Sequence, residues 1–331
     1  MPPPVRRSVF VLVVTFALVL TGAALAGNGG VAPPAPASPG AESIRQIYWL
    51  ILGVSAVIFL LVTVTLVLFM VRYRSRGRPR EVEGPQIRGH TNLELAWTAG
   101  PVLILAIIAG FVFWKVSDIG ATSGSPTSAP ASHEVRIDGH QYYWEFTYPN
   151  GAISVDHLRL PYNKPVRLRV VSYYVNHSWW VPALGGKLDA IPGHPNQTTW
   201  LATKLGTFNG QCAEFCGLLH AQMLAKVEVL PAAQYAAFIQ QRKTDKEALG
   251  KETFTGACAK CHGLAGQGGY GPNIASNPLL ANKAGLTKLL RLGGIKMPAV
   301  GNDWPQFQID ALVAYLHTRF HVSGGASGSK G

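Results

Sequence analysis

Two long apolar stretches constrain this 331-residue chain more than any other feature, because each has the length needed to cross a bilayer. Residues 47–71 and 95–114 contain no Asp, Glu, Lys or Arg, whereas the chain after Lys115 has the composition of a soluble protein. We therefore expect two transmembrane helices within residues 46–117, followed by a large polar region.

The segment between the two apolar stretches is strongly basic. Arginines stand there at alternate positions, namely Arg72, Arg74, Arg76, Arg78 and Arg80. A short basic loop between two membrane spans follows the positive-inside rule, so we expect this loop in the cytoplasm and both chain ends outside. This loop, together with the basic N-terminal residues Arg6 and Arg7, accounts for much of the formal net charge of +12. That charge is therefore no evidence for a nucleic-acid partner.

The N-terminus is typical of a signal peptide. Arg6 and Arg7 precede an apolar run, and Ala24-Leu25-Ala26 supplies a small-x-small cleavage site. We expect cleavage after residues 1–26, although a short membrane anchor would have a similar pattern.

Composition divides the remaining chain into linkers and domains. Residues 27–45 and 118–133 are rich in Pro, Gly, Ala and Ser, so we expect flexible linkers there. Short β-like runs with turn signals fill 134–243 and predict an antiparallel β-sandwich or barrel. Helical periodicity in 245–322 predicts a small all-α domain, and we expect a disordered tail over 323–331.

One pair of cysteines lies in the sequence CAKCH, which is the attachment pattern of a c-type haem. The thiols of Cys258 and Cys261 can add to the two haem vinyl groups, and His262 can bind the iron. Met297 follows at a suitable distance along the chain and would be the second axial ligand. No βαβ pattern surrounds the motif, so a thioredoxin-like redox site is disfavoured. This region resembles small monohaem cytochromes c over residues 248–320.

The other cysteine pair belongs to a cluster of soft metal ligands. Cys212, Cys216, His220 and Met223 follow one another within a single loop between two β-like runs. In an exported domain the pair could form a disulfide. Two thiolates with imidazole and thioether instead favour copper, because a loop methionine is a poor zinc ligand. Paired thiolates can bridge two copper ions, which would require a second histidine from elsewhere in the chain.

The runs HSWWVPALGGKLDAIPG and QCAEFCGLLHAQM make residues 45–230 resemble subunit II of the haem-copper oxidases. The resemblance implies a cupredoxin barrel with a binuclear CuA centre. In it Cys212 and Cys216 would bridge the coppers, and His177 and His220 would be terminal ligands. Met223 and the backbone carbonyl of Glu214 would be axial ligands. The whole chain then combines a two-helix transmembrane hairpin, an all-β cupredoxin barrel and an all-α cytochrome c domain.

The same resemblance implies roles for four further side chains. Glu94 would lie at a proton-uptake entrance, although it could equally cap its helix. Glu214 would reach a magnesium ion shared with subunit I. Tyr142 and Trp144 would form the electron-entry patch near CuA, although buried barrel aromatics would have the same pattern. The family usually has Trp where this chain has Tyr142, which disfavours direct entry from a soluble cytochrome.

The function implied is subunit II of a caa-type terminal oxidase in the bacterial plasma membrane, with both redox domains outside. Electrons would pass from haem c through CuA to subunit I, where oxygen is reduced to water with proton translocation. Subunit III and an upstream donor, cytochrome c or a quinol–cytochrome c reductase, would be further partners. A short flexible tether would hold the cytochrome near CuA.

Three alternatives differ in class. A CuA-containing nitric oxide reductase would keep the copper ligands but need not keep Glu94. A quinol oxidase subunit would lack Cys212 and Cys216. A disulfide-stapled membrane protein would leave the histidines and methionines of both motifs without a role.

Overall fold

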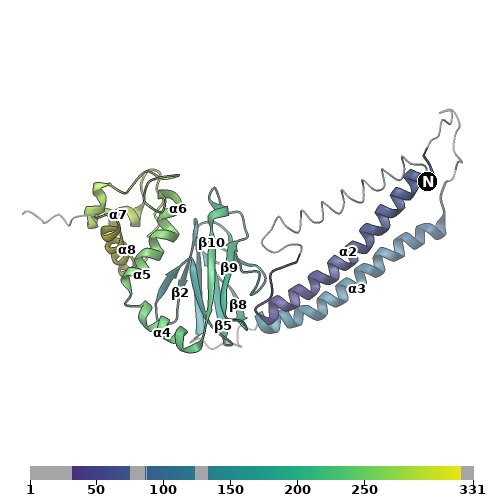
Figure 1. Cartoon of the computed structure of the whole chain (residues 1–331), viewed down its shortest axis with the longest axis horizontal. Helices are drawn as coiled ribbons and strands as arrows, with labels where there is room; N and C mark the ends of the chain where they lie inside the picture. The colour runs from purple at the N-terminus through teal and green to yellow at the C-terminus, as the bar shows by residue number, and fades with distance from the viewer. Residues whose placement is uncertain (1–31, 75–85, 87, 124–132, 322–331) are drawn as a thin grey trace, which may run out of the picture. The chain divides into compact units, whose positions relative to one another are not determined.

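The computed structural model describes residues 32–74, 86, 88–123 and 133–321 (Figure 1). These residues belong to two compact units, one made of residues up to 41 and from 122 onward, the other of residues 42–121. The predicted signal peptide, most of the basic loop and the predicted tail lie outside the described residues.

Two long helices contain the apolar stretches, α2 (Pro39–Arg72) and α3 (Thr91–Ser123). Their most apolar windows have mean hydropathies of 2.9 and 2.2, and none of either window is buried by protein. Both helices therefore have the length and composition of membrane spans, as predicted. The two helices extend over residues 39–45 and 118–123, which the sequence had placed in linkers.

The chain just before α2 is also fixed rather than flexible. The Ala37 amide donates to the Ala183 carbonyl at 2.7 Å, and the Ala37 carbonyl accepts from the Thr203 amide at 2.8 Å. The Ser38 hydroxyl donates to the Leu184 carbonyl at 2.7 Å. Ala37 and Ser38 are buried, because their small side chains let the backbone enter the edge of the β-domain.

The β-domain consists of two five-stranded sheets. Their strand orders are β3-β2-β1-β5-β8 and β4-β10-β9-β6-β7. The strands are β1 (Glu134–His140), β2 (Tyr143–Thr147), β3 (Ile153–Val155), β4 (His157–Pro161), β5 (Pro165–Ser172), β6 (His177–Trp180), β7 (Leu188–Ala190), β8 (Asn196–Leu201), β9 (Gly206–Cys212) and β10 (Leu224–Leu230). The β1–β5 and β10–β4 pairs are parallel, so the expectation of a purely antiparallel sandwich was wrong.

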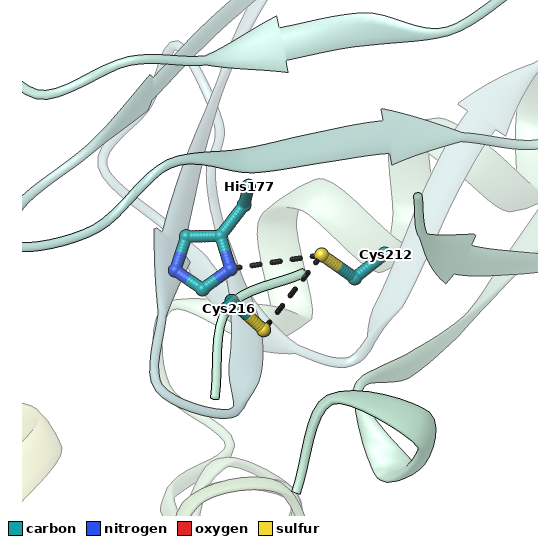
Figure 2. A group of neighbouring side chains, drawn as sticks. All are labelled: His177, Cys212 and Cys216. Carbon is teal, nitrogen blue, oxygen red and sulfur yellow. Dashed lines mark hydrogen bonds between the residues drawn. The ribbon is translucent and has the colours of Figure 1, made fainter. Parts of the chain in front are cut away.

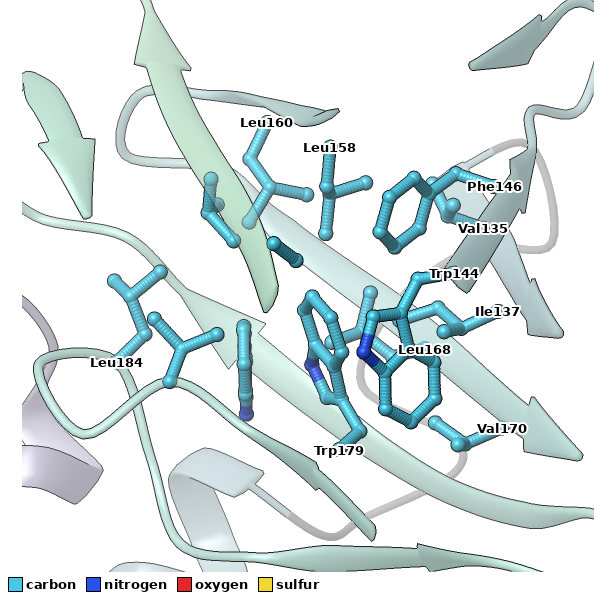
Figure 3. Packing of buried hydrophobic residues seen from close by; sticks show 14 of the residues in the cluster. Val135, Ile137, Trp144, Phe146, Leu158, Leu160, Leu168, Val170, Trp179 and Leu184 are labelled. Atoms are coloured by element: carbon cyan, nitrogen blue, oxygen red, sulfur yellow. The ribbon is translucent and has the colours of Figure 1, made fainter. Parts of the chain in front are cut away.

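Alternating burial along the strands forms the core between the sheets (Figure 3). In β5, every second residue from Val166 onward is buried, which is the period of a half-buried strand. Aromatic rings fill the centre, with the Trp144 and Trp179 ring centroids 5.1 Å apart in an edge-on arrangement. Phe146 contacts the same Trp179 ring from β2, with centroids 5.4 Å apart. This packing gives β6 and β9 a rigid support.

The C-terminal domain is helical, as predicted. Its elements are α5 (Lys246–Thr253), the π-helix η3 (Phe254–Cys258), α6 (Ala259–His262), η4 (Pro278–Ala281), α7 (Lys283–Leu292) and α8 (Gln306–Arg319). Helix α4 (Ala232–Arg242) precedes them, lies within the predicted bounds of the β-domain and packs against its core. Helices α5 and α8 cross closely at Gly250, where a Cβ would lie 2.2 Å from the Ala311 carbonyl oxygen. Phe254, Leu290, Trp304 and Leu312 are buried in its core.

The helical domain packs directly on the β-domain within the same unit. The Tyr143 hydroxyl donates to the Val300 carbonyl at 3.1 Å and accepts from the Trp304 indole at 3.0 Å. On another part of this interface, Arg242 donates to the Ile153 carbonyl at 2.7 Å. The predicted flexible tether is therefore wrong, because helix α4 and buried polar contacts hold the two domains together.

Candidate functional site

The soft ligands predicted from the sequence meet at one end of the β-domain. His177 begins β6 and Cys212 ends β9, and these two strands are neighbours in the sheet. Cys216 and His220 lie in the loop that follows, with His220 at the start of the short helix η2 (His220–Gln222). Met223 directly precedes β10 and is fully buried. The hairpin β9–β10 thus returns the chain so that all five side chains converge.

Five donor atoms form a chain of close contacts. The His177 Nδ1 lies 3.7 Å from the Cys212 Sγ, which lies 4.0 Å from the Cys216 Sγ (Figure 2). From the Cys216 Sγ it is 3.5 Å to the His220 Nδ1 and 3.8 Å to the Met223 Sδ. The Glu214 carbonyl oxygen lies 3.2 Å from the Cys212 Sγ. The structure therefore brings together every ligand atom that the resemblance implied.

These separations fit metal ligands. A tetrahedral ion with bonds of about 2.3 Å to sulfur and about 2.0 Å to nitrogen separates its ligand atoms by about 3.5–3.8 Å. The sulfur atoms are far beyond the disulfide length of about 2.05 Å, and both cysteines are free. His177, Cys212 and Cys216 alone place their ligand atoms within 4.8 Å of one another. The donor set, two thiols, two imidazoles and a thioether, suits copper.

Burial sets the protonation of this cluster. It lowers the pKa of His177 to about 4, so the ring is neutral near pH 7 and keeps a lone pair for a metal. Burial, followed by the neighbouring Cys212, raises the pKa of Cys216 to about 12. A thiolate at this position therefore requires a bound cation.

Two glycines make room for the cluster. A Cβ on Gly139 of β1 would lie 2.9 Å from the His177 ring, so only glycine lets that ring lie against the strand. Gly217 has a φ of +125° in the loop, and a Cβ there would lie 2.7 Å from the Tyr142 hydroxyl. The loop and Tyr142 are thus in close contact.

The CAKCH motif lies on the helix formed by η3 and α6. Cys258 ends η3, and Cys261 and His262 lie on the following turn of α6, so the two thiols are one helical turn apart. The His262 Nδ1 lies 2.8 Å from the Pro272 carbonyl. This contact assigns the ring proton to Nδ1 and leaves Nε2 for a metal. A Cβ on Gly271 would lie 2.9 Å from the ring, which explains a glycine there.

Met297 lies half-buried against the same core cluster as Cys258. Ile274 and Leu279 also pack against this cluster, so the methionine and the attachment motif border one apolar region. The donor set of two thiols, an imidazole with its orienting carbonyl and a thioether fits covalent haem c.

The two predicted carboxylates differ in environment. The Glu94 carboxylate accepts from the His90 amide at 3.1 Å and so caps the start of α3. This is the capping role that the sequence left open. We call residues 213–223, between β9 and β10, the copper loop after its predicted ligands. The Glu214 side chain is exposed on it, near the exposed apolar residues Phe215 and Leu218 in the sequence.

The two aromatic residues predicted to form the electron-entry patch, Trp144 and Tyr142, differ in burial. Trp144 is fully buried, with its ring 5.8 Å from the His177 ring between centroids. Tyr142 is partly buried and lies against the copper loop. Sequence reasoning missed two polar residues beside it, Gln141 and Lys260. Lys260 stands between the two cysteines of the CAKCH motif, and this position was the signal that could have identified it.

Three family models match the chain. They are the transmembrane domain of cytochrome c oxidase subunit II over 27–114, the periplasmic domain of the same subunit over 151–230, and cytochrome c oxidase, cbb3-type, subunit III, over 245–316.

Two relatives are described as cytochrome c oxidase subunit 2. One, from Alkalihalophilus pseudofirmus, is 29% identical over 82% of this chain and 88% of its own length. The other, from Bacillus sp. (strain PS3), is 31% identical over 73% of this chain and 78% of its own length. Among solved structures, the periplasmic domain of subunit II of cytochrome oxidase from Bradyrhizobium japonicum is 30% identical. It covers 36% of this chain and 98% of that domain, with a TM-score of 0.34.

Proposed function

This chain belongs to the cytochrome c oxidase subunit II family, and from that premise we propose that it is a caa-type subunit, with its own haem c. As a member of the family it is the electron-transfer subunit of a membrane oxidase, with an outer-side domain and a subunit I partner. The specific sites and the order of transfer are the proposal. The convergence of five soft donors at one end of the β-domain carries it.

We propose that Cys212 and Cys216 bridge two coppers, with His177 and His220 as the terminal ligands. Met223 and the Glu214 carbonyl would be the axial ligands. Trp144 and Gly139 support this assignment, because these paired residues of β2 and β1 both lie against the His177 ring. A preformed, buried cage changes little between redox states, which lowers the cost of electron transfer.

We propose that Cys258 and Cys261 attach haem c, with His262 and Met297 as axial ligands. The Pro272 carbonyl would orient His262 by accepting a hydrogen bond from its Nδ1–H group. When bound, the two groups would supply one-electron chemistry, with the electron entering at the haem, passing to the coppers and leaving to subunit I.

The partner surface would include the exposed end of the copper loop. Phe215 is 77% exposed and Leu218 is 69% exposed, which is unusual for large apolar side chains and typical of a contact surface. Glu214 precedes Phe215 in the sequence, between the two cysteines, and its exposed carboxylate could hold magnesium together with subunit I. We also propose subunit III as a partner, and an upstream cytochrome c or quinol–cytochrome c reductase as the electron donor. Protons would enter at Glu94.

Purification of the chain with its partner subunit tests this function. We expect about two coppers and one covalent haem per chain, with haem staining that survives denaturing electrophoresis and disappears in a Cys258→Ala, Cys261→Ala variant. The complex should consume oxygen. Consumption of nitric oxide in place of oxygen would instead identify a reductase, and a single copper per chain would refute the binuclear assignment.

A further inference from the structure

The two metal-binding motifs are joined through two consecutive residues of the β-domain. The Lys260 ammonium, between the two haem-attachment cysteines, donates to the Tyr142 carbonyl at 2.7 Å. The neighbouring Gln141 side chain donates to the Cys216 carbonyl at 2.7 Å. A continuous route of covalent and hydrogen bonds thus runs from the CAKCH turn, through Lys260, Tyr142 and Gln141, to the copper loop. We call these three residues the bridge.

The Lys260 end of the bridge is held firmly. Its ammonium also forms an ion pair with Asp156, and the Lys260 side chain is only 14% exposed. Asp156 in turn accepts from the Trp144 amide at 2.8 Å, so the carboxylate is fixed to the strand that carries the aromatic core. A largely buried, paired lysine has little freedom to move, which makes its contact with the Tyr142 carbonyl a persistent one.

The Gln141 end reaches the copper loop itself. Cys216 is a proposed copper ligand, and the Gln141 amide binds its backbone carbonyl. The Tyr142 ring lies against Gly217, the next residue of that loop. A shift at residues 141–142 would therefore move the loop that carries the ligands.

Other contacts hold the domains together without touching either motif. Gln308 donates to Glu145 at 2.8 Å, and Trp304 donates to Tyr143 at 3.0 Å. Arg159 forms a 2.9 Å ion pair with Glu252. Because these contacts already dock the helical domain, docking as such does not require the bridge.

We propose that Lys260 and Gln141 are positioning residues that connect the haem-binding turn to the copper loop and set the rate of electron transfer between them. This inference rests on the proposed function. In the step concerned, one electron leaves ferrous haem iron, which becomes ferric, and reduces the copper pair by one electron. No proton or group moves with it.

Two substitutions interrupt the bridge at opposite ends. Lys260→Met removes both the ion pair and the donor to Tyr142, and Gln141→Met removes the donor to Cys216. We expect each to slow haem-to-copper transfer after flash reduction about tenfold, because the rate depends steeply on how the two sites are positioned. Covalent haem, copper content and both midpoint potentials should stay at wild-type values.

Lys283→Met is the matched control. It also replaces an ion-paired lysine of the helical domain, since Lys283 pairs with Asp310 at 2.9 Å, but the Lys283 side chain is 59% exposed and distant in sequence from the motif. We expect it to leave the transfer rate unchanged. An equal slowing in Lys283→Met would overturn the bridge, because loss of charge alone would then explain the effect.

The double variant Lys260→Met, Gln141→Met tests whether the two residues act in one continuous route or as two independent contacts. In a route through both residues, either break interrupts the whole, so Lys260→Met, Gln141→Met should be no slower than the slower single variant. Independent contacts would give multiplied effects, and that result would overturn the proposal.

Hydrogen–deuterium exchange of the metal-free chain supplies a readout that needs no electron transfer. Lys260→Met should speed exchange in residues 211–223, to which the bridge is hydrogen-bonded through Gln141, whereas Lys283→Met should not. Unchanged exchange together with unchanged transfer in both bridge variants would refute the inference. If the wild-type chain itself showed no haem-to-copper transfer, the proposed function would fail instead.

Discussion

Gln308 of α8 donates a 2.8 Å hydrogen bond to the carboxyl group of Glu145 on β2, and both side chains are buried at the interface of the two domains. Burial raises the pKa of Glu145 to about 8, although the Gln308 hydrogen bond lowers it in part. Glu145 is therefore protonated in the folded chain at neutral pH, whereas it is ionised in the unfolded chain.

The raised pKa predicts how stability depends on pH. Between about pH 4.5 and pH 8 the folded chain holds a proton that the unfolded chain releases, so the free energy of unfolding falls as pH rises. The contribution is fully present below the unfolded pKa and lost as pH rises through the folded one. Glu145→Gln removes the ionisable group and keeps a polar side chain facing Gln308.

Unfolding measured at pH 5, 7 and 9 checks this prediction. Relative to wild type, Glu145→Gln should gain stability as pH rises, with most of the gain reached by pH 9. Asp189→Asn, at an exposed carboxylate, is the control and should show no such trend. A pH-independent difference between Glu145→Gln and wild type would show that Glu145 ionises normally.

The second prediction concerns the buried thioether beside the cysteines. Met223→Leu conserves volume, so we expect a folded chain, with about 1 kcal/mol or less of lost stability. It removes a weak axial ligand, so copper content should remain near two per chain while the copper midpoint potential shifts. Metal analysis and a redox titration measure these two quantities. An unchanged potential would mean that Met223 only fills the core.

The sequence predicted contacts between residues that are close along the chain better than contacts between residues that are far apart in it. The spacing of Cys212, Cys216, His220 and Met223 is local, so one loop revealed most of the cluster. His177 is 35 residues away from Cys212 and was found only through the resemblance.

The contacts that sequence reasoning missed depend on docking. Gln141 and Lys260 lie 75 and 118 residues from their partners. The place of Lys260 inside the CAKCH motif singles it out, but nothing in the sequence indicates which residue it contacts. Composition also misled at Ala37, where small residues typical of a linker are what allow the backbone to be buried. The tether was mispredicted for the same reason, since the burial of Tyr143 depends on a distant domain.

The third prediction separates two roles of Glu94. Its carboxylate caps the His90 amide, and Glu94→Gln keeps an acceptor oxygen there while removing the proton-binding group. If Glu94 admits protons, both Glu94→Gln and Glu94→Ala should slow oxygen turnover while haem-to-copper transfer stays at the wild-type rate.

A capping role gives a different pattern. Only Glu94→Ala would then change the enzyme, through loss of one exposed hydrogen bond worth about 0.5–1.5 kcal/mol. Turnover and thermal stability of the assembled oxidase, measured side by side for the two variants, decide between the roles. Wild-type turnover in Glu94→Gln would rule out proton entry at this carboxylate.

The last prediction is that the attached haem domain is the obligatory donor to the coppers. Because this domain is packed on the β-domain through buried contacts, such as that of Tyr143 with Trp304, transfer is intramolecular. Its rate should therefore be independent of protein concentration and nearly independent of salt. Flash reduction over a tenfold range of concentration measures this directly.

The Cys258→Ala, Cys261→Ala variant isolates the role of the haem, because it removes the attachment thiols and leaves the interface side chains in place. We expect it to keep its coppers yet oxidise a soluble cytochrome c at a small fraction of the wild-type rate. The packed helical domain covers Tyr143, and Tyr142 stands where a Trp is usual, so direct entry should be poor. Tyr142→Trp in the haem-free variant should restore part of the rate. If the haem-free chain oxidises soluble cytochrome c as fast as the intact one, the helical domain is an accessory and electrons reach the coppers without it.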